Sequence, residues 1–407
     1  MKVSIAKNIK SDFPWFKHNP GWTYLDNSAT SLKPQYVINS IVNFYEKWSS
    51  NPHNSDSSLT YHVLEMIDES RGKLAKLINA NKQEVIFTSG ATESLSLIAN
   101  GLSPFINKGD EIIVTYGEHT SNLLPWMELT KSKGCKLVVV GKDNEVPTEQ
   151  TIIKAINKKT KVIAFANITN LIGYELDAAK ITKAARNLNK GIYIICDATQ
   201  AIPHKRIDVK KTDLDFLVCS AHKMCAGTGI GMVYMKDKYL SKIKPIRFGG
   251  GMNNNVSCQD YTFASSPDKF EGGSPHSAGI VSWGAAIDYL NAYGWDKLAN
   301  HEAMLKDYIN KEFAKIPNLD YINPQGKYPI VAFNIKGIHS QDLANYLGNK
   351  KIIVRGGLSC AKLAHHIIKE PAVVRASFYL YNDKHDVDVL VKALKSFKKG
   401  DIVNHVI

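Results

Sequence analysis

Short apolar runs alternate with amphipathic segments through the first 235 residues of the chain. Runs of four or five apolar residues bounded by polar turns indicate buried strands, and apolar positions three and four residues apart indicate helices. The pattern predicts strands at residues 84–87, 111–114, 136–140, 162–166, 192–196, 216–219 and 232–235. It predicts helices at residues 35–48, 60–78, 94–99, 123–133, 149–157 and 178–188. Strands separated by helices favour a mainly parallel sheet that is covered on both faces.

The pattern changes after Phe248. Three consecutive glycines begin a polar stretch to residue 268, which predicts a mobile loop. Helical periodicity from residue 279 to 313 predicts a long helical region that leads into a second domain. Further short strands and helices are predicted at residues 331–334, 341–347, 352–354 and 386–397. We therefore expect an α/β chain with a large domain, residues 23–290, and a smaller α+β domain that combines residues 1–22 with 291–407.

Composition and charge exclude several classes of protein. No apolar run approaches the roughly 18 residues that a membrane helix needs, and the N-terminal segment lacks the apolar core of a signal peptide. We therefore expect a cytoplasmic protein that binds no membrane. The net charge of +13 is spread along the chain, so we expect no nucleic-acid partner. The six cysteines form no CxxC pair, which argues against a metal site.

Arginine is rare in this lysine-rich chain. A chain that uses lysine for its charged surface is expected to keep arginine where a planar, two-pronged donor is needed, as for a carboxylate. Arg355 and Arg375 lie on either side of Cys360 and fit this expectation. Arg71 and Arg186 are interpreted instead as ordinary residues on helix faces. The sequence holds 45 lysines and six arginines: Arg71, Arg186, Arg206, Arg247, Arg355 and Arg375.

Polar residues follow several of the predicted strands, and the carboxyl ends of parallel strands meet at one edge of a sheet. The turn from Thr88 to Thr92 leads from a strand towards a helix, so its backbone N–H groups and hydroxyls could hold a phosphate. His119 follows the next strand. Each of these features alone is explained as well by an ordinary helix cap or a loop residue.

Two further strand ends carry a carboxylate and an amine. Asp197 ends an apolar strand, where its charge needs a cationic partner, and Gln200 follows one turn later. Lys223 lies in a turn with Ser220 and His222 between two predicted strands. A lysine that forms a Schiff base would need a desolvated site that lowers its pKa, together with a carbonyl partner.

These four strand ends together match one cofactor. They offer a phosphate-binding turn, a histidine that can stack on a ring, a carboxylate for a protonated ring nitrogen and a lysine for an aldehyde. Pyridoxal 5′-phosphate requires this set of contacts. Asp197 and Lys223 are 26 positions apart, which leaves room for one connection between neighbouring strands.

The chain resembles the class V, fold-type I pyridoxal-phosphate enzymes and, within them, the group II (SufS-like) cysteine desulfurases. The resemblance extends almost from end to end. It implies a mainly parallel seven-stranded sheet in the large domain and a smaller α+β C-terminal domain. The motifs that carry it are YLDNSAT, FTSGATES, GEHTSNLLPW, DATQAI, SAHKMCAGTGIG, FEGGSP, VRGGLSCA and VRASFYLYN.

The resemblance implies a role for each residue that would bind the cofactor. Lys223 would form the Schiff base, Asp197 would pair with the ring nitrogen, and Gln200 would contact the ring oxygen. His119 would stack on the ring and take part in catalysis. The phosphate would be held by Thr92, Ser220, His222 and, from the other subunit of a homodimer, Ser274.

The resemblance also implies the substrate and the nucleophile. Arg375 would bind the carboxylate of L-cysteine, with Arg355 and Asn170 lining the same pocket. Cys360, as thiolate, would take the sulfur as a persulfide and release alanine. The short GGLSCA loop is typical of group II enzymes, which pass sulfur to an acceptor protein, here a SufE- or SufU-like one.

Three departures from the family pattern leave some alternatives open. Ser359 stands where a histidine is usual, residues 51–57 lack the usual arginine and second histidine, and Ala198-Thr199 replaces Gly-Ala. Selenocysteine lyase or another class V aminotransferase or lyase activity is therefore the alternative. The acceptor and its pathway, iron–sulfur cluster assembly or tRNA thiolation, also stay open.

Overall fold

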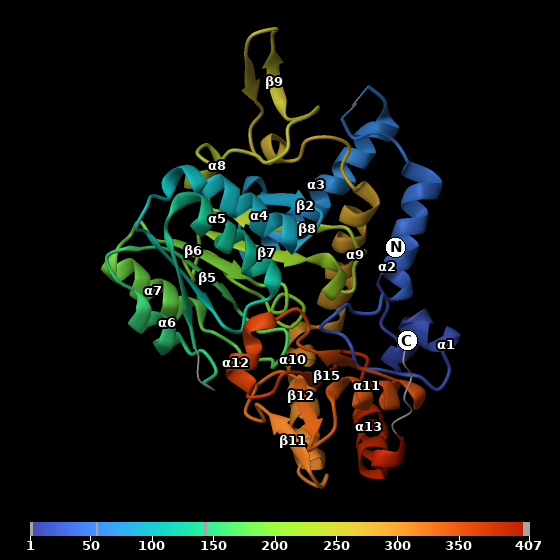
Figure 1. The fold of residues 1–407 in the computed structure, drawn as a ribbon. Helices are drawn as coiled ribbons and strands as arrows, with labels where there is room; N and C mark the ends of the chain where they lie inside the picture. The colour runs from blue at the N-terminus through green and yellow to red at the C-terminus, as the bar shows by residue number, and fades with distance from the viewer. Residues whose placement is uncertain (1–2, 54–55, 142–144, 402–407) are drawn as a thin grey trace.

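The computed structural model describes residues 3–53, 56–141 and 145–401 (Figure 1). Asn54 and Ser55, in the polar loop that departs from the family pattern, lie outside the described residues, as do the two ends of the predicted small domain. The strands are β1 (Thr23–Tyr24), β2 (Val85–Thr88), β3 (Glu111–Thr115), β4 (Lys136–Val140), β5 (Thr160–Ala166), β6 (Tyr193–Asp197), β7 (Phe216–Ser220), β8 (Gly231–Met235), β9 (Asn253–Val256), β10 (Tyr261–Phe263), β11 (Leu319–Ile322), β12 (Ile330–Ile335), β13 (Ile352–Ile353), β14 (Arg355–Gly357) and β15 (Val373–Ser377).

The helices of the described residues run through both halves of the chain. They are α1 (Pro14–His18), α2 (Gln35–Asn43), α3 (Ser58–Ile78), α4 (Ala91–Leu102), α5 (Leu124–Lys133), α6 (Glu149–Ala155), α7 (Ala178–Leu188), α8 (Asp237–Leu240), α9 (Ser277–Tyr293), α10 (Trp295–Phe313), α11 (Ser340–Asn349), α12 (His365–Ile368) and α13 (Lys384–Ser396). A π-helical turn (Phe44–Trp48) extends α2. Within residues 3–53, 56–141 and 145–401, every helix is too short or too polar to span a bilayer.

The predicted seven-stranded, mainly parallel sheet is confirmed. Its strand order is β2-β8-β7-β6-β5-β3-β4, and only β8 runs antiparallel to its neighbours. Because β2 and β7 both pair antiparallel with β8, they run in the same direction as the rest. The carboxyl ends of β2, β3, β5, β6 and β7 therefore meet at one edge of the sheet.

Helices cover both faces of this sheet, which explains its unbroken apolar strands. Along β7, Leu217 and Cys219 pack into one core, whereas Phe216 and Val218 pack into the other, because successive side chains of a strand point to opposite faces. The first core includes side chains from α2, α3, α6, α7 and α9. The second core includes side chains from α4, α5 and α8.

The C-terminal part of the chain forms a second sheet, in the lower part of Figure 1. It is antiparallel, with the order β11-β12-β15-β14. The smaller α+β domain is thus confirmed as a fold, although β11, β14 and β15 were not predicted. β1 pairs in parallel with β13, so the segment before α2 lies against this part of the molecule. The predicted domain boundaries at residues 23 and 290 stay predictions.

Two predicted elements differ from the structure. The helical region predicted over residues 279–313 is present, but as two helices, because Gly294 takes a left-handed φ of 97° that ends α9 and separates it from α10. The predicted loop between Gly249 and Asp268 contains the hairpin β9–β10, which projects from the body at the top of Figure 1. Its turn is closed by Ser257, whose N–H donates to the Asp260 carbonyl at 2.8 Å and whose hydroxyl accepts from the Asp260 N–H.

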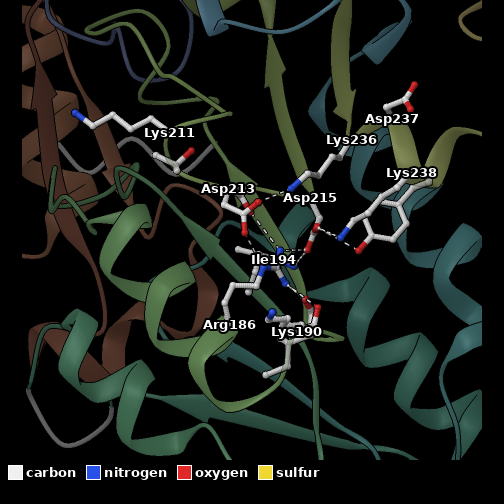
Figure 2. A network of polar contacts seen from close by, with 12 residues as sticks. Arg186, Lys190, Ile194, Lys211, Asp213, Asp215, Lys236, Asp237 and Lys238 are labelled. Atoms are coloured by element: carbon white, nitrogen blue, oxygen red, sulfur yellow. Dashed lines mark hydrogen bonds and ion pairs between the residues drawn. The ribbon is translucent and has the colours of Figure 1, made fainter.

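Arg71 and Arg186 are not the ordinary helix-face residues that we predicted. Arg71 makes a two-pronged contact with Glu271, at 2.6 and 2.9 Å. Arg186 joins α7 to the start of β7 by donating to Asp213 at 3.0 Å and to the fully buried Asp215 at 2.6 Å (Figure 2). Arginine thus occurs here, as at Arg355, where two donors of one guanidinium meet carboxylates.

The Asp215 carboxylate should contribute strongly to stability. It accepts from Arg186, from the Ile194 N–H at 2.9 Å and from the Tyr239 hydroxyl at 3.2 Å. Asp215→Asn removes the charge that compensates a mostly buried guanidinium, so we expect a loss of about 3 kcal/mol in the free energy of unfolding. Urea unfolding followed by circular dichroism measures it. The matched control is Asp237→Asn, an exposed residue at the start of α8, expected to cost under about 0.5 kcal/mol; equal effects of the two changes would contradict the prediction.

Candidate active site

The shared edge of the large sheet brings the predicted residues together. Asp197 is the last residue of β6, and Ser220 is the last residue of β7. His119 follows β3 and caps a short 3-10 turn (Thr120–Asn122). Thr92 lies in the first turn of α4, which begins three residues earlier than predicted. The small domain adds Arg375 from β15, as well as β14 and the loop that follows it.

These residues line a cavity of about 320 Å³, within the size range of ligand pockets. Eleven of the twelve predicted site residues lie in its wall. Ser274 is the exception: it is exposed and lies outside this cavity. The lining residues are Ser28, Ala29, Ala91, Thr92, His119, Ser121, Ala166, Ile168, Asn170, Asp197, Thr199, Gln200, Ser220, His222, Lys223, Arg355, Ser359, Cys360 and Arg375.

Lys223 has the desolvated surroundings that a reactive amine requires. Burial lowers its pKa to about 8, with the charge of Asp197 opposing this shift and that of Arg375 adding to it. Its ammonium donates to Gln200 Oε1 at 3.3 Å, and Gln200 in turn donates through Nε2 to the Ser28 hydroxyl at 3.1 Å. The neutral form of the amine is therefore much more populated near neutral pH than in an exposed lysine, and Gln200 orients it.

Asp197 and His119 complete the surroundings of Lys223. The carboxylate of Asp197 is buried and accepts from the Thr199 N–H at 3.0 Å. His119 accepts from the Ser121 N–H through Nδ1 at 3.1 Å, which leaves Nε2 to carry the proton of the neutral ring. Burial lowers the pKa of His119, and the positive charge of Lys223 lowers it further. A neutral imidazole is suited to stacking on an aromatic ring.

Hydroxyls and a helix N-terminus form a cradle for an anion at one end of the cavity. The Ser220 hydroxyl accepts from the Ala91 N–H at 2.8 Å, and the Thr92 hydroxyl lies 2.8 Å from that of Ser121. Free N–H groups in the first turn of α4 favour an anion. The cradle depends on Gly231, where a Cβ would lie 2.4 Å from the Cα of Gly90 and push this turn away from β8.

His222 lies beside this cradle as a neutral ring. Burial lowers its pKa to about 4, with Lys223 and Lys33 adding to the shift. Its backbone carbonyl accepts from the Ser31 N–H at 3.1 Å, which ties the turn after β7 to the N-terminal segment. His222 can therefore donate a hydrogen bond to an anion at neutral pH.

Two arginines line the opposite side of the cavity, and the buried Asp26 lies behind them and binds both. Arg375 is 1% exposed and donates to Asp26 at 2.7 Å and to the Asn170 carbonyl at 2.9 Å. Arg355 donates to Asp26 through Nε at 3.1 Å and Nη2 at 2.7 Å. Hydrogen bonding to Asp26 raises the pKa of Arg355, whereas burial lowers that of Arg375.

Cys360 is exposed at the mouth of the cavity, in a loop with an unusual backbone. Ser359 and Cys360 have left-handed φ values of 48° and 63°, a conformation that costs about 1–2 kcal/mol per non-glycine residue. Three hydrogen bonds offset this cost. The Thr120 N–H and hydroxyl donate to the Cys360 carbonyl at 2.8 and 2.5 Å, and Asn170 Nδ2 donates to the Ser359 carbonyl at 2.6 Å.

Several residues at the site were not assigned from the sequence. Asp26 belongs to a motif that we used for the resemblance, yet the motif alone gave no role for it. Glu118 is fully covered, and burial raises its pKa to about 7 although Thr115 and Asn122 donate to it at 2.6 and 2.7 Å. It thereby holds the turn that carries His119. A carboxylate directly before a predicted site histidine was the signal that could have identified it.

Unpaired polar atoms around the cavity fit a bound ligand. In the described residues, eight buried side-chain atoms lack a hydrogen-bond partner, and four of them belong to cavity residues. These four are Asn170 Oδ1, Thr199 Oγ1, Ser359 Oγ and Arg375 Nε. A buried polar group without a partner is costly unless a ligand or water satisfies it. The Asp197 carboxylate, the Lys223 amine with its lowered pKa and the anion cradle together fit pyridoxal phosphate.

Comparisons with known proteins agree with this geometry. A protein of Ureaplasma parvum, described as a probable cysteine desulfurase, is 47% identical over 98% of this chain and 100% of its own length. A probable cysteine desulfurase of Halalkalibacterium halodurans is 36% identical over 97% of this chain and 98% of its own. Among solved structures, the apo cysteine desulfurase of Thermococcus onnurineus superposes with a TM-score of 0.92 at 30% identity, covering 98% of this chain and 100% of that one.

A family model covers most of the chain. The aminotransferase class-V model matches residues 23–390, which include every residue that lines the cavity. The family resemblance read from the sequence motifs is thereby confirmed. The chain belongs to the aminotransferase class-V family.

Proposed function

We propose that this protein is a pyridoxal-phosphate-dependent cysteine desulfurase that converts L-cysteine to L-alanine and takes the sulfur onto Cys360. One observation carries the proposal: Cys360 and Lys223 line the same cavity, together with Arg375, whose guanidinium is suited to a carboxylate. The sequence similarity to cysteine desulfurases over the full chain supports it. The group II form, which the short loop around Cys360 favours, is part of the proposal.

The cofactor would be held by residues from four strand ends. Asp197 would pair with its ring nitrogen, His119 would stack on its ring and Gln200 would contact its ring oxygen. Its phosphate would lie in the cradle formed by Thr92, Ser220 and His222. When bound, pyridoxal phosphate supplies an electron sink conjugated to the substrate's Cα.

The protein's own groups would then act on the substrate in a defined order. Arg375 binds the carboxylate, with Asn170 and Arg355 beside it, and this contact orients the amino acid. The Lys223 amine removes the proton from Cα. The Cys360 thiolate attacks the substrate sulfur: an S–S bond forms, the Cβ–S bond breaks, and its electron pair goes to the carbon that is protonated to give alanine.

Cys360 should be essential for sulfur release and dispensable for cofactor binding. We expect Cys360→Ala to retain the visible absorbance of bound pyridoxal phosphate and to lose about a hundredfold or more of its sulfide and alanine production from L-cysteine. Alanine and sulfide are quantified with and without a thiol acceptor.

The matched control is Cys258→Ala, which removes the other exposed cysteine, on the hairpin β9–β10. It should leave the rate unchanged. Undiminished sulfide release by Cys360→Ala would refute the persulfide step and favour another class V lyase reaction, and faster turnover of L-selenocysteine that does not need Cys360 would indicate selenocysteine lyase.

The rate of cofactor uptake should depend on the protonation of Lys223. Only the neutral amine can attack the aldehyde, so the rate should rise with pH and level off above the pKa of about 8. Stopped-flow absorbance after mixing apoprotein with pyridoxal phosphate measures it. A midpoint near 10.5, the ordinary lysine value, would show that the site does not desolvate the amine.

The proposed assembly is a homodimer in which Ser274 of each chain contacts the phosphate bound by the other. The exposure of Ser274 and its position outside its own chain's cavity support this arrangement. Light scattering should give about twice the chain mass of 45.2 kDa. Ser274→Ala should increase the dissociation constant for pyridoxal phosphate several-fold in equilibrium dialysis, whereas exposed Ser257→Ala should not. A monomer with normal cofactor affinity would contradict it.

The sulfur acceptor and the location belong to the same proposal. A cysteine persulfide held on a short loop needs an acceptor thiol that can reach the cavity mouth, and a SufE- or SufU-like protein would provide one. A cytoplasmic location, and function without membrane or nucleic-acid binding, stay predictions.

A further inference from the structure

The two arginines of the cavity lie in an arrangement that is unfavourable without a counterion. Arg355 on β14 and Arg375 on β15 are direct cross-strand partners in the small sheet. Like charges opposite each other destabilise a pair of strands. Here Asp26 lies between them and binds both, at 2.7 Å from a terminal nitrogen of each.

Backbone contacts fix Asp26 in this position. It forms an isolated parallel bridge with Ser377 at the end of β15, and the next N–H, that of Asn27, donates to the Ser377 carbonyl. The Ser377 N–H donates in turn to the Leu25 carbonyl at 2.7 Å. Asp26 is 6% exposed. The carboxylate is therefore a fixed, buried charge behind the two cavity-lining arginines rather than a mobile surface charge.

The three charges sum to a single positive charge. Arg375 is buried and lines the cavity, where it can bind one carboxylate. Arg355 donates through Nε and one terminal nitrogen to Asp26, so these donors are not available to a ligand. Cys360 and Arg355 line the same cavity. The side-chain end of a bound amino acid, which must approach Cys360, would therefore also approach Arg355.

We propose that Asp26 is a specificity-determining residue that restricts the cavity to amino acids with one carboxylate. By occupying Arg355, it withholds the second arginine from an anionic side chain and repels such a side chain directly. The proposal rests on the proposed function for the identity of the site. It concerns how the amino acid is bound, and not the fate of sulfur.

The test compares L-alanine, which has one carboxylate, with L-aspartate, which has two. Isothermal titration calorimetry on the holoenzyme gives the dissociation constant of each. In Asp26→Asn the net charge of the trio rises by one, so the ratio of the L-aspartate constant to the L-alanine constant should fall by about tenfold. A second change, Arg355→Gln in the same chain, restores the single charge and should bring the ratio back towards that of the parent protein.

Arg355→Gln alone provides a test that does not depend on how well the Asp26 variants fold. Asp26 would then neutralise Arg375 by itself, so L-alanine should bind about fivefold or more weakly and the ratio should not fall. A ratio in Asp26→Asn within twofold of the parent value, or unchanged L-alanine binding in Arg355→Gln, would overturn the inference. Because neither ligand contains sulfur, the two proposals can fail separately. If the protein showed these binding changes but released no sulfide, the proposed function would be wrong and this inference would stand.

Discussion

Parallel pairing of β3, β5, β6 and β7 is the constraint on which the site depends. It places the carboxyl ends of strands far apart in sequence at one edge, where helices begin and backbone N–H groups point outward. β2 joins this set because two antiparallel pairings through β8 restore its direction. The predicted cofactor-binding residues, which follow four different strands, thereby meet in one cavity without long loops.

Burial at this edge changes what the side chains can do. The Lys223 amine and the His119 and His222 rings all have lowered pKa values because the cavity wall removes water from them. Neutral histidines can donate to an anion or stack on a ring, and a partly neutral lysine can act as a nucleophile and base. Charge is kept where it is compensated: Asp26 between two arginines, and Asp197 beside Lys223. The same desolvation that makes the amine reactive makes unpaired charge costly.

The rare arginines connect the sequence with the structure. In a lysine-rich chain, their retention predicted two-pronged contacts with carboxylates, and Arg355 makes such a contact with Asp26, whereas Arg375 gives Asp26 one donor. The expectation also holds at Arg71 and Arg186, which we had interpreted as surface residues of helices. A sequence pattern cannot distinguish a solvated arginine on a helix from one that reaches over a turn to a distant carboxylate, because Glu271 is 200 positions from Arg71.

Apolar runs and motif order in the sequence determined the seven strands, their alternation with helices, the class V family and the residues around Lys223. These features are local: strand burial, helix periodicity and turn residues are encoded within a few positions of each other. Only the tertiary structure decided that β14 and β15 stand side by side, that Asp26 lies between their arginines and that Thr120 and Asn170 hold the left-handed loop of Cys360. Those contacts join segments up to about 350 residues apart, and they follow from packing and charge compensation that no local pattern records.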